Sequence, residues 1–215
     1  MIYMFDSGVE PASGYCTNYF SRGDLIDRVG HGTSMASIIK SISKESKIYS
    51  VKIGDHKPRL DDIEECLQYV TSLNVDSDDF ILFNANLPQS SKLENFNSYI
   101  RDLSTKCKII VPAGNNSSSI DNFSPANNPN VWTIGSLNKS KKITSVSNLN
   151  GNKGIDIWVV STNTPAFTKE MMPIRLFGTS VAAAITAALA DQFKIKNKQE
   201  LIKITEKYNN DAAFH

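Results

Sequence analysis

The sequence predicts an α/β fold in which a mostly parallel sheet is covered by helices on both faces. Short apolar runs alternate along the chain with segments whose apolar residues recur at helical spacing, which is typical of parallel sheets. The chain has 215 residues, of which 40% are hydrophobic, and this suits one well-packed core but not two. We therefore expect residues 1–215 to form a single domain.

The first part of the chain contains short apolar runs that predict strands at 2–5, 48–53 and 80–83. In 35–42 the apolar residues recur every three or four positions, which predicts a helix. The same spacing predicts a second helix at 60–73. Residues 10–30 are polar, and we expect them to form a loop.

The second part of the chain continues this alternation. Apolar runs predict strands at 109–111, 131–134 and 155–160. Helical spacing predicts a helix at 93–103, and a nearly all-apolar stretch predicts a buried helix at 179–193. A charged segment at 198–208 is expected to form an exposed helix.

Four polar residues lie where predicted strands end or predicted helices begin. Asp6 and Asn115 each follow an apolar strand, whereas His31 and Ser180 each begin a helix. In open parallel sheets, ligands bind at the carboxyl ends of the strands. We therefore expect these four residues to meet at one edge of the sheet, although they are far apart in the sequence.

These residue types are the ones that a serine hydrolase needs. A serine hydroxyl is a poor nucleophile unless a histidine accepts its proton, and a carboxylate orients that histidine. Ser180, His31 and Asp6 supply these groups. The negative oxygen of the tetrahedral intermediate needs hydrogen-bond donors, which the Asn115 side chain and the Ser180 backbone N–H can provide.

The segments around these residues resemble the motifs of the subtilases, the subtilisin-like serine proteases. The resemblance runs through nearly the whole chain and is carried by Asp6-Ser7-Gly8, Asp27-Arg28-Val29-Gly30-His31-Gly32-Thr33, Asn84-Ala85-Asn86-Leu87, Ala113-Gly114-Asn115 and Gly178-Thr179-Ser180. It implies a three-layer α/β/α fold and endopeptidase activity on a protein or peptide substrate. It also implies Asp6, His31 and Ser180 as the catalytic triad and Asn115 as the oxyanion donor.

The resemblance further implies a substrate cleft between two walls. Gly54 belongs to one wall, and Asn86 and Leu87 belong to the other. Ala113 and Gly114 are expected to contact substrate from the oxyanion loop. Pro88 stands where the family usually has a glycine, and proline cannot donate a backbone hydrogen bond to an extended peptide.

Two further departures from the family bear on function. Ser34 lies in a copy of the serine motif, Gly32-Thr33-Ser34-Met35-Ala36-Ser37, but it lies one turn into the helix that His31 begins. The order of the family's motifs places the nucleophile last, so we assign that role to Ser180. The chain has no calcium-loop pattern, and we expect neither a metal nor a cofactor.

We expect no counterpart of the family's N-terminal propeptide before the first strand. Three alternatives follow: the chain folds unaided, a precursor segment has been removed, or a protein partner replaces the propeptide. The altered cleft and the lack of a calcium loop also support a rival interpretation, a degenerate protease fold that binds without cleaving. An esterase of another α/β fold fits poorly, because the chain lacks a Gly-x-Ser-x-Gly elbow.

The composition excludes several other classes. The formal net charge of +1 gives no reason to expect binding to nucleic acid or to a membrane surface. The longest near-apolar run, at 181–190, is too short to span a bilayer. No secretory signal is recognisable, and the cysteines (Cys16, Cys66 and Cys107) lack metal-ligand spacing. We therefore expect a cytoplasmic location.

Overall fold

A parallel sheet forms the centre of the molecule in a computed structural model that describes residues 1–56 and 58–211. Its seven strands lie in the order β2-β3-β1-β4-β6-β8-β9, and all neighbouring pairs are parallel. Their bounds are Asn18–Phe20 for β2, Ile48–Lys52 for β3, Ile2–Asp6 for β1, Phe80–Phe83 for β4, Lys108–Pro112 for β6, Trp132–Leu137 for β8 and Ile157–Val160 for β9.

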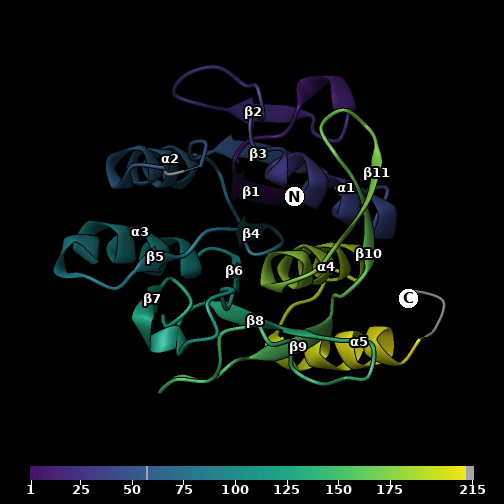
Figure 1. Cartoon of the computed structure of the whole chain (residues 1–215). Coiled ribbons are helices and arrows are strands. Elements are labelled where there is room, and N and C mark those ends of the chain that lie inside the picture. Colours follow the sequence, from purple (N-terminus) through teal and green to yellow (C-terminus); the bar gives the residue numbers. More distant parts are fainter. Residues whose placement is uncertain (57, 212–215) are drawn as a thin grey trace.

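Helices cover both faces of this sheet, as the alternation in the sequence predicts (Figure 1). One face carries α1 (His31–Ile42), α4 (Thr179–Gln192) and α5 (Lys198–Asn210). The other face carries α2 (Leu60–Ser72) and α3 (Glu94–Ser104). The fold is therefore the three-layer α/β/α arrangement that the resemblance implies.

Two hydrophobic cores lie on opposite sides of the sheet. Successive side chains of a strand point to opposite faces. In β1, Ile2 and Met4 accordingly join the core beneath α1 and α4, whereas Tyr3 and Phe5 join the core beneath α2 and α3. A strand that is buried on both faces shows a continuous apolar run, which is why β1 and β4 are recognisable in the sequence.

Helix α4 is buried on nearly all sides. Its residues from Val181 to Asp191 are all buried, and they include six alanines. The helix packs against α1, α5 and the strands β4, β6, β8 and β9. Small alanine side chains let these elements approach the helix closely, so its N-terminus is fixed relative to the sheet.

Three features of the fold were not predicted. The expected loop at 10–30 contains β2, which extends the sheet at its edge. An antiparallel hairpin is formed by β10 (Thr164–Phe167) and β11 (Pro173–Leu176), and β5 (Leu87–Pro88) pairs with β7 (Phe123–Ser124). These strands are short and partly exposed, so they lack the apolar run that reveals a buried strand.

The described residues also contain 3₁₀ turns at Pro11–Ser13, Ser91–Leu93 and Ile120–Asn122.

Within residues 1–56 and 58–211, no helix combines the length and the apolar character needed to cross a bilayer.

The core beneath α2 and α3 yields a stability prediction. Phe96 is fully buried, and its ring lies 5.5 Å from the ring of Phe83. We expect Phe96→Ala to lower the free energy of unfolding by about 3–5 kcal/mol, because the substitution removes buried surface and leaves a cavity. The exposed Phe193 provides a control, since Phe193→Ala should change that energy by less than about 0.5 kcal/mol. Urea denaturation of both variants measures the difference, and equal effects would contradict this account of the core.

Candidate active site

The candidate site lies at the carboxyl edge of the sheet, between β1 and β4. These strands are neighbours, yet the helices that follow them, α1 and α3, pack on opposite faces of the sheet. Helices that leave adjacent strands toward opposite faces open a crevice at the strand ends. Asp6 ends β1 and Asn84 follows β4 directly, so both side chains are placed at this crevice.

Asp6 is buried and its carboxylate accepts three hydrogen bonds. The Oδ1 atom lies 2.8 Å from Nδ1 of His31 and accepts the backbone N–H of Ser7 at 2.7 Å. The Oδ2 atom accepts Nδ2 of Asn84 at 3.0 Å. A carboxylate only accepts hydrogen bonds, so Nδ1 of His31 carries the proton. The Nε2 atom of a neutral His31 is then the unprotonated nitrogen.

His31 combines a buried partner with an accessible ring. Its side chain is 37% exposed, whereas that of Asp6 is 2% exposed. The negative charge of Asp6 raises the pKa of His31 above its ordinary value of 6.5, against the opposing effect of burial, and Asp27 contributes in the same direction. The pair is therefore arranged to stabilise a positive charge on the imidazole.

A close backbone approach brings His31 to Asp6. His31 begins α1, and the next residue, Gly32, packs against the loop that follows β1. A Cβ atom at Gly32 would lie 1.9 Å from the carbonyl oxygen of Gly8. Only glycine permits this approach, which explains the residue type that follows His31.

Ser180 reaches the same crevice from the start of α4, which packs beside α1 on the same face of the sheet. It is the second residue of α4, whose N-cap is Gly178 with a φ of 111°. Together with Asp6, His31 and Asn84, it lines a cavity of about 290 Å³. The positive end of the helix dipole lies at this N-terminus.

Asn115 is held by the residue that precedes Ser180. Its Oδ1 atom accepts the backbone N–H of Thr179 at 3.0 Å and the Thr179 hydroxyl at 3.1 Å. The same hydroxyl accepts the N–H of Gly114 at 3.1 Å. These contacts fix the orientation of the amide, so its Nδ2 is the group left to donate. Gly178 allows the approach, since a Cβ there would lie 3.1 Å from Oδ1 of Asn115.

The residues predicted to contact substrate differ in their position relative to this cavity, and Asn86 and Leu87 are not among the residues that line it. Gly54 lines the cavity of about 290 Å³ with His31 and Ser180. Asn86 lies farther along the chain from Asn84, and its Nδ2 donates to the carbonyl of Pro112 at 2.8 Å. Leu87 lies in β5, opposite Ser124.

Ala113 and Gly114 have their backbone groups engaged within the protein. The Ala113 N–H donates to Ile134 at 2.9 Å, and its carbonyl accepts Nδ2 of Asn148 at 2.9 Å. The Gly114 N–H binds Thr179, and its carbonyl accepts the N–H of Asn148 at 2.8 Å. These contacts anchor the loop that carries Asn115, and direct substrate contact by Ala113 or Gly114 stays a prediction.

Three residues near the site were not identified as functional from the sequence. Asn84 binds Asp6, and the signal for it was a polar residue directly after a buried strand. Ser7 and Asp27 form a buried hydrogen bond of 2.8 Å beneath His31. No local pattern distinguishes Asp27 from an ordinary loop residue, because its burial depends on the packing of α1 against the loop after β1.

Ser34, the serine in the copied motif, is engaged elsewhere. It is buried, and its hydroxyl donates to the carbonyl of Phe167 in β10 at 2.9 Å. In the described part of the chain, no group of three or more histidine, cysteine, aspartate and glutamate side chains is arranged to hold a metal ion. Cys16, Cys66 and Cys107 are all buried free thiols, and burial raises the pKa of each to about 12.

Comparisons with known proteins identify the architecture of the chain. No protein-family model matches the chain. A solved structure described as a cold adapted subtilisin-like serine proteinase matches with a TM-score of 0.78 and 21% sequence identity, over 97% of this chain and 80% of that chain. This likeness establishes the fold.

A curated relative, Subtilisin-like protease 2 of Pseudogymnoascus destructans (strain ATCC MYA-4855 / 20631-21), is 24% identical over 249 aligned positions. The match covers 99% of this chain and 61% of the relative, so the chain corresponds to about three fifths of that protein's length. The chain is thus similar to subtilisin-like proteases in its fold and in its alignment with this relative.

Proposed function

We propose that this chain is a serine endopeptidase that hydrolyses peptide bonds with Ser180 as nucleophile, His31 as general base and Asp6 as the carboxylate that orients His31. One observation carries the proposal: Nδ1 of His31 lies 2.8 Å from a buried Asp6 oxygen, and His31, Asp6 and Ser180 line one cavity. This arrangement of residue types is the one that activates a serine hydroxyl. The fold and the family support the same assignment.

The reaction has two halves. In the first, Oγ of Ser180 attacks the scissile carbonyl carbon while Nε2 of His31 takes the hydroxyl proton. The tetrahedral intermediate then collapses, the C–N bond breaks, and His31 gives the proton to the departing amine. In the second half, water attacks the acyl group on Ser180 by the same steps, which releases the acid and restores the serine.

Asn115 supplies an oxyanion donor in this scheme. Its Oδ1 is occupied by Thr179, so the amide presents its Nδ2 hydrogens to an incoming ligand. The backbone N–H of Ser180, in the first turn of α4, is the second donor. Donors held in place before the reaction begins stabilise the developing charge without a cost of reorganisation at that moment.

Cavities on both sides of His31 are consistent with an extended peptide substrate. The first holds about 290 Å³ and touches Ser180, Gly54 and Asn84. The second holds about 410 Å³ and lies between the start of α1 and the β10–β11 hairpin, where Ile174 and Leu176 line it. Both are bordered by Val29 and His31. A peptide that crosses His31 would place residues on either side of its scissile bond in these two cavities.

The nucleophile can be tested with a fluorophosphonate probe, which labels activated serines. We expect the wild-type protein to be labelled and Ser180→Ala to lose both labelling and peptide hydrolysis, because the attacking oxygen is gone. Ser34→Ala is the matched control and should be labelled like the wild type, since the Ser34 hydroxyl binds Phe167. Labelling of Ser180→Ala would refute the assignment. An unlabelled but folded wild type would favour a degenerate protease that binds without cleaving.

The oxyanion donor is tested by Asn115→Ala. We expect kcat to fall by about 10²–10³-fold with little change in KM, the size of effect measured when one oxyanion donor is removed from a subtilisin. Asn116→Ala is the control, because the Asn116 backbone N–H, not its side chain, makes the local contact with Asn148. Wild-type kcat in Asn115→Ala, measured under saturating peptide, would remove Asn115 from the mechanism.

The raised pKa of His31 sets the pH dependence of turnover. A general base must be neutral, so kcat/KM should rise with pH as His31 loses its proton. Because Asp6 raises the pKa of His31, the midpoint of this rise should lie above 6.5, the ordinary value for histidine. A pH–rate profile locates the midpoint, and an NMR titration of His31 in Asp6→Asn should give a lower pKa than in the wild type. A flat profile between about pH 5 and 8 would contradict His31 as the base.

A further inference from the structure

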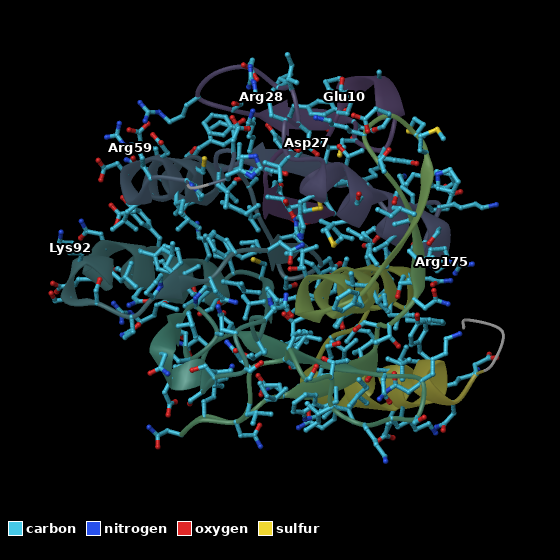
Figure 2. The ribbon with its side chains drawn as sticks, viewed as in Figure 1. Glu10, Asp27, Arg28, Arg59, Lys92 and Arg175 are labelled. Atoms are coloured by element: carbon cyan, nitrogen blue, oxygen red, sulfur yellow. The ribbon has the colours of Figure 1, made fainter. Side chains whose placement is uncertain are left out.

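Asp27 is a buried carboxylate in an otherwise exposed loop. Residues 22–26 and 28 are exposed, whereas no part of Asp27 is accessible to solvent. Figure 2 shows Asp27 inside the fold, while Arg28 and Glu10 lie near the outer edge. A buried charge is costly unless hydrogen bonds satisfy it, so its contacts are expected to matter.

Each carboxylate oxygen of Asp27 accepts two hydrogen bonds. The Oδ1 atom accepts the Ser7 hydroxyl at 2.8 Å and the backbone N–H of Gly30 at 2.8 Å. The Oδ2 atom accepts the backbone N–H of Thr33 at 2.9 Å and the Thr33 hydroxyl at 2.6 Å. All of these donors are neutral groups, and they lie within two residues of Asp6 or His31 in the sequence.

The two hydroxyls have no freedom to turn away from Asp27. Ser7 Oγ accepts the backbone N–H of Gly32 at 3.0 Å, and Thr33 Oγ1 accepts the backbone N–H of Glu10 at 2.9 Å. Each hydroxyl therefore uses its oxygen for a backbone donor and points its proton at the Asp27 carboxylate. The Ser7 and Thr33 hydroxyls thus link the loop after β1 to the first turn of α1, and the Asp27 carboxylate fixes the direction of both hydroxyl protons.

We propose that Asp27 is the positioning residue that holds the His31 segment against the Asp6 segment, so that Nδ1 of His31 and Oδ1 of Asp6 meet at hydrogen-bond distance. Ser7 directly follows Asp6, while Gly30 and Thr33 flank His31. Asp27 thus binds both segments at once. The role in turnover rests on the proposed protease function, whereas the positioning of His31 does not.

A carboxylate is required at this position, and an amide of the same shape cannot replace it. Each Asp27 oxygen faces one backbone N–H and one hydroxyl proton. In either orientation of an asparagine side chain, its Nδ2 group would face a backbone N–H, of Gly30 or of Thr33. Two donors cannot bond each other, and the backbone N–H cannot rotate away. An unmet buried donor is unfavourable, so we expect the first turn of α1 to shift away from the loop after β1.

The loop itself has other attachments, which makes a folded variant attainable. Nζ of Lys52 donates to the carbonyl of Ile26 at 2.7 Å, and Nζ of Lys169 donates to the carbonyl of Arg28 at 2.8 Å. These contacts flank Asp27 on both sides. Loss of the Asp27 carboxylate is therefore expected to move His31 without unfolding the protein.

The test uses Asp27→Asn and reads His31 directly by NMR. The Nδ1 proton of His31, shared with a carboxylate, gives a far-downfield resonance that needs no substrate and no turnover. We expect Asp27→Asn to shift or lose this resonance. We also expect kcat to fall by about 10–100-fold while KM changes by less than about threefold, since misplacement of a reacting group lowers the rate more than binding.

Asp24→Asn is the matched control, because it removes the same charge from the exposed part of the same loop. It should keep the wild-type resonance and kcat. A wild-type resonance and kcat in Asp27→Asn would overturn the proposal, including the case in which only the melting temperature falls, which would indicate a purely stabilising role.

Two further outcomes keep the test decisive. If Asp27→Asn does not fold, Ser7→Ala takes its place, because it removes the bridge between Asp27 and Gly32 and should shift the same resonance. A wild-type resonance in Ser7→Ala would then overturn the proposal. If the wild type shows the resonance but no turnover, the protease function fails and the positioning of His31 is still decided by NMR.

Discussion

The close contact between the first turn of α1 and the loop after β1 is the constraint on which the candidate site depends. Gly32 permits it, because any side chain there would collide with the carbonyl of Gly8. The Asp27 carboxylate maintains it through hydrogen bonds to both segments. Only at this separation can His31 lie 2.8 Å from Asp6, so the electrostatics of the imidazole follow from backbone packing.

The part of the site that contains Ser180 and Asn115 depends on α4. An alanine-rich helix buried within its core has little freedom to move, so Ser180 at its start is fixed relative to β1 and β4. Thr179 links this helix to Asn115 and Gly114, and therefore the proposed nucleophile and the proposed oxyanion donor share one hydrogen-bonded unit. Each half of the site is held by its own hydrogen bonds, and both halves lie at the carboxyl edge of the same sheet.

The cavities that border His31 are lined by more irregular parts of the chain. Two cavities border His31, and one of them lies between the start of α1 and the β10–β11 hairpin that packs against this helix. The hairpin is attached to that helix through Ser34 and Ser37, which bond the backbone of Phe167. The copied serine motif in α1 thus has a structural use here, which differs from that of the motif at Ser180.

The sequence by itself determined the alternation of strands and helices, the parallel sheet and the residue types of the site, because burial on both faces and helical packing leave periodic apolar patterns. It also placed Asp6, His31, Asn115 and Ser180 at element ends. Only the tertiary structure decided that Asp6 binds Asn84, that Asp27 is buried, and that β2 and the β10–β11 hairpin form. These features depend on contacts between segments far apart in the chain, and such contacts leave no local pattern in the sequence.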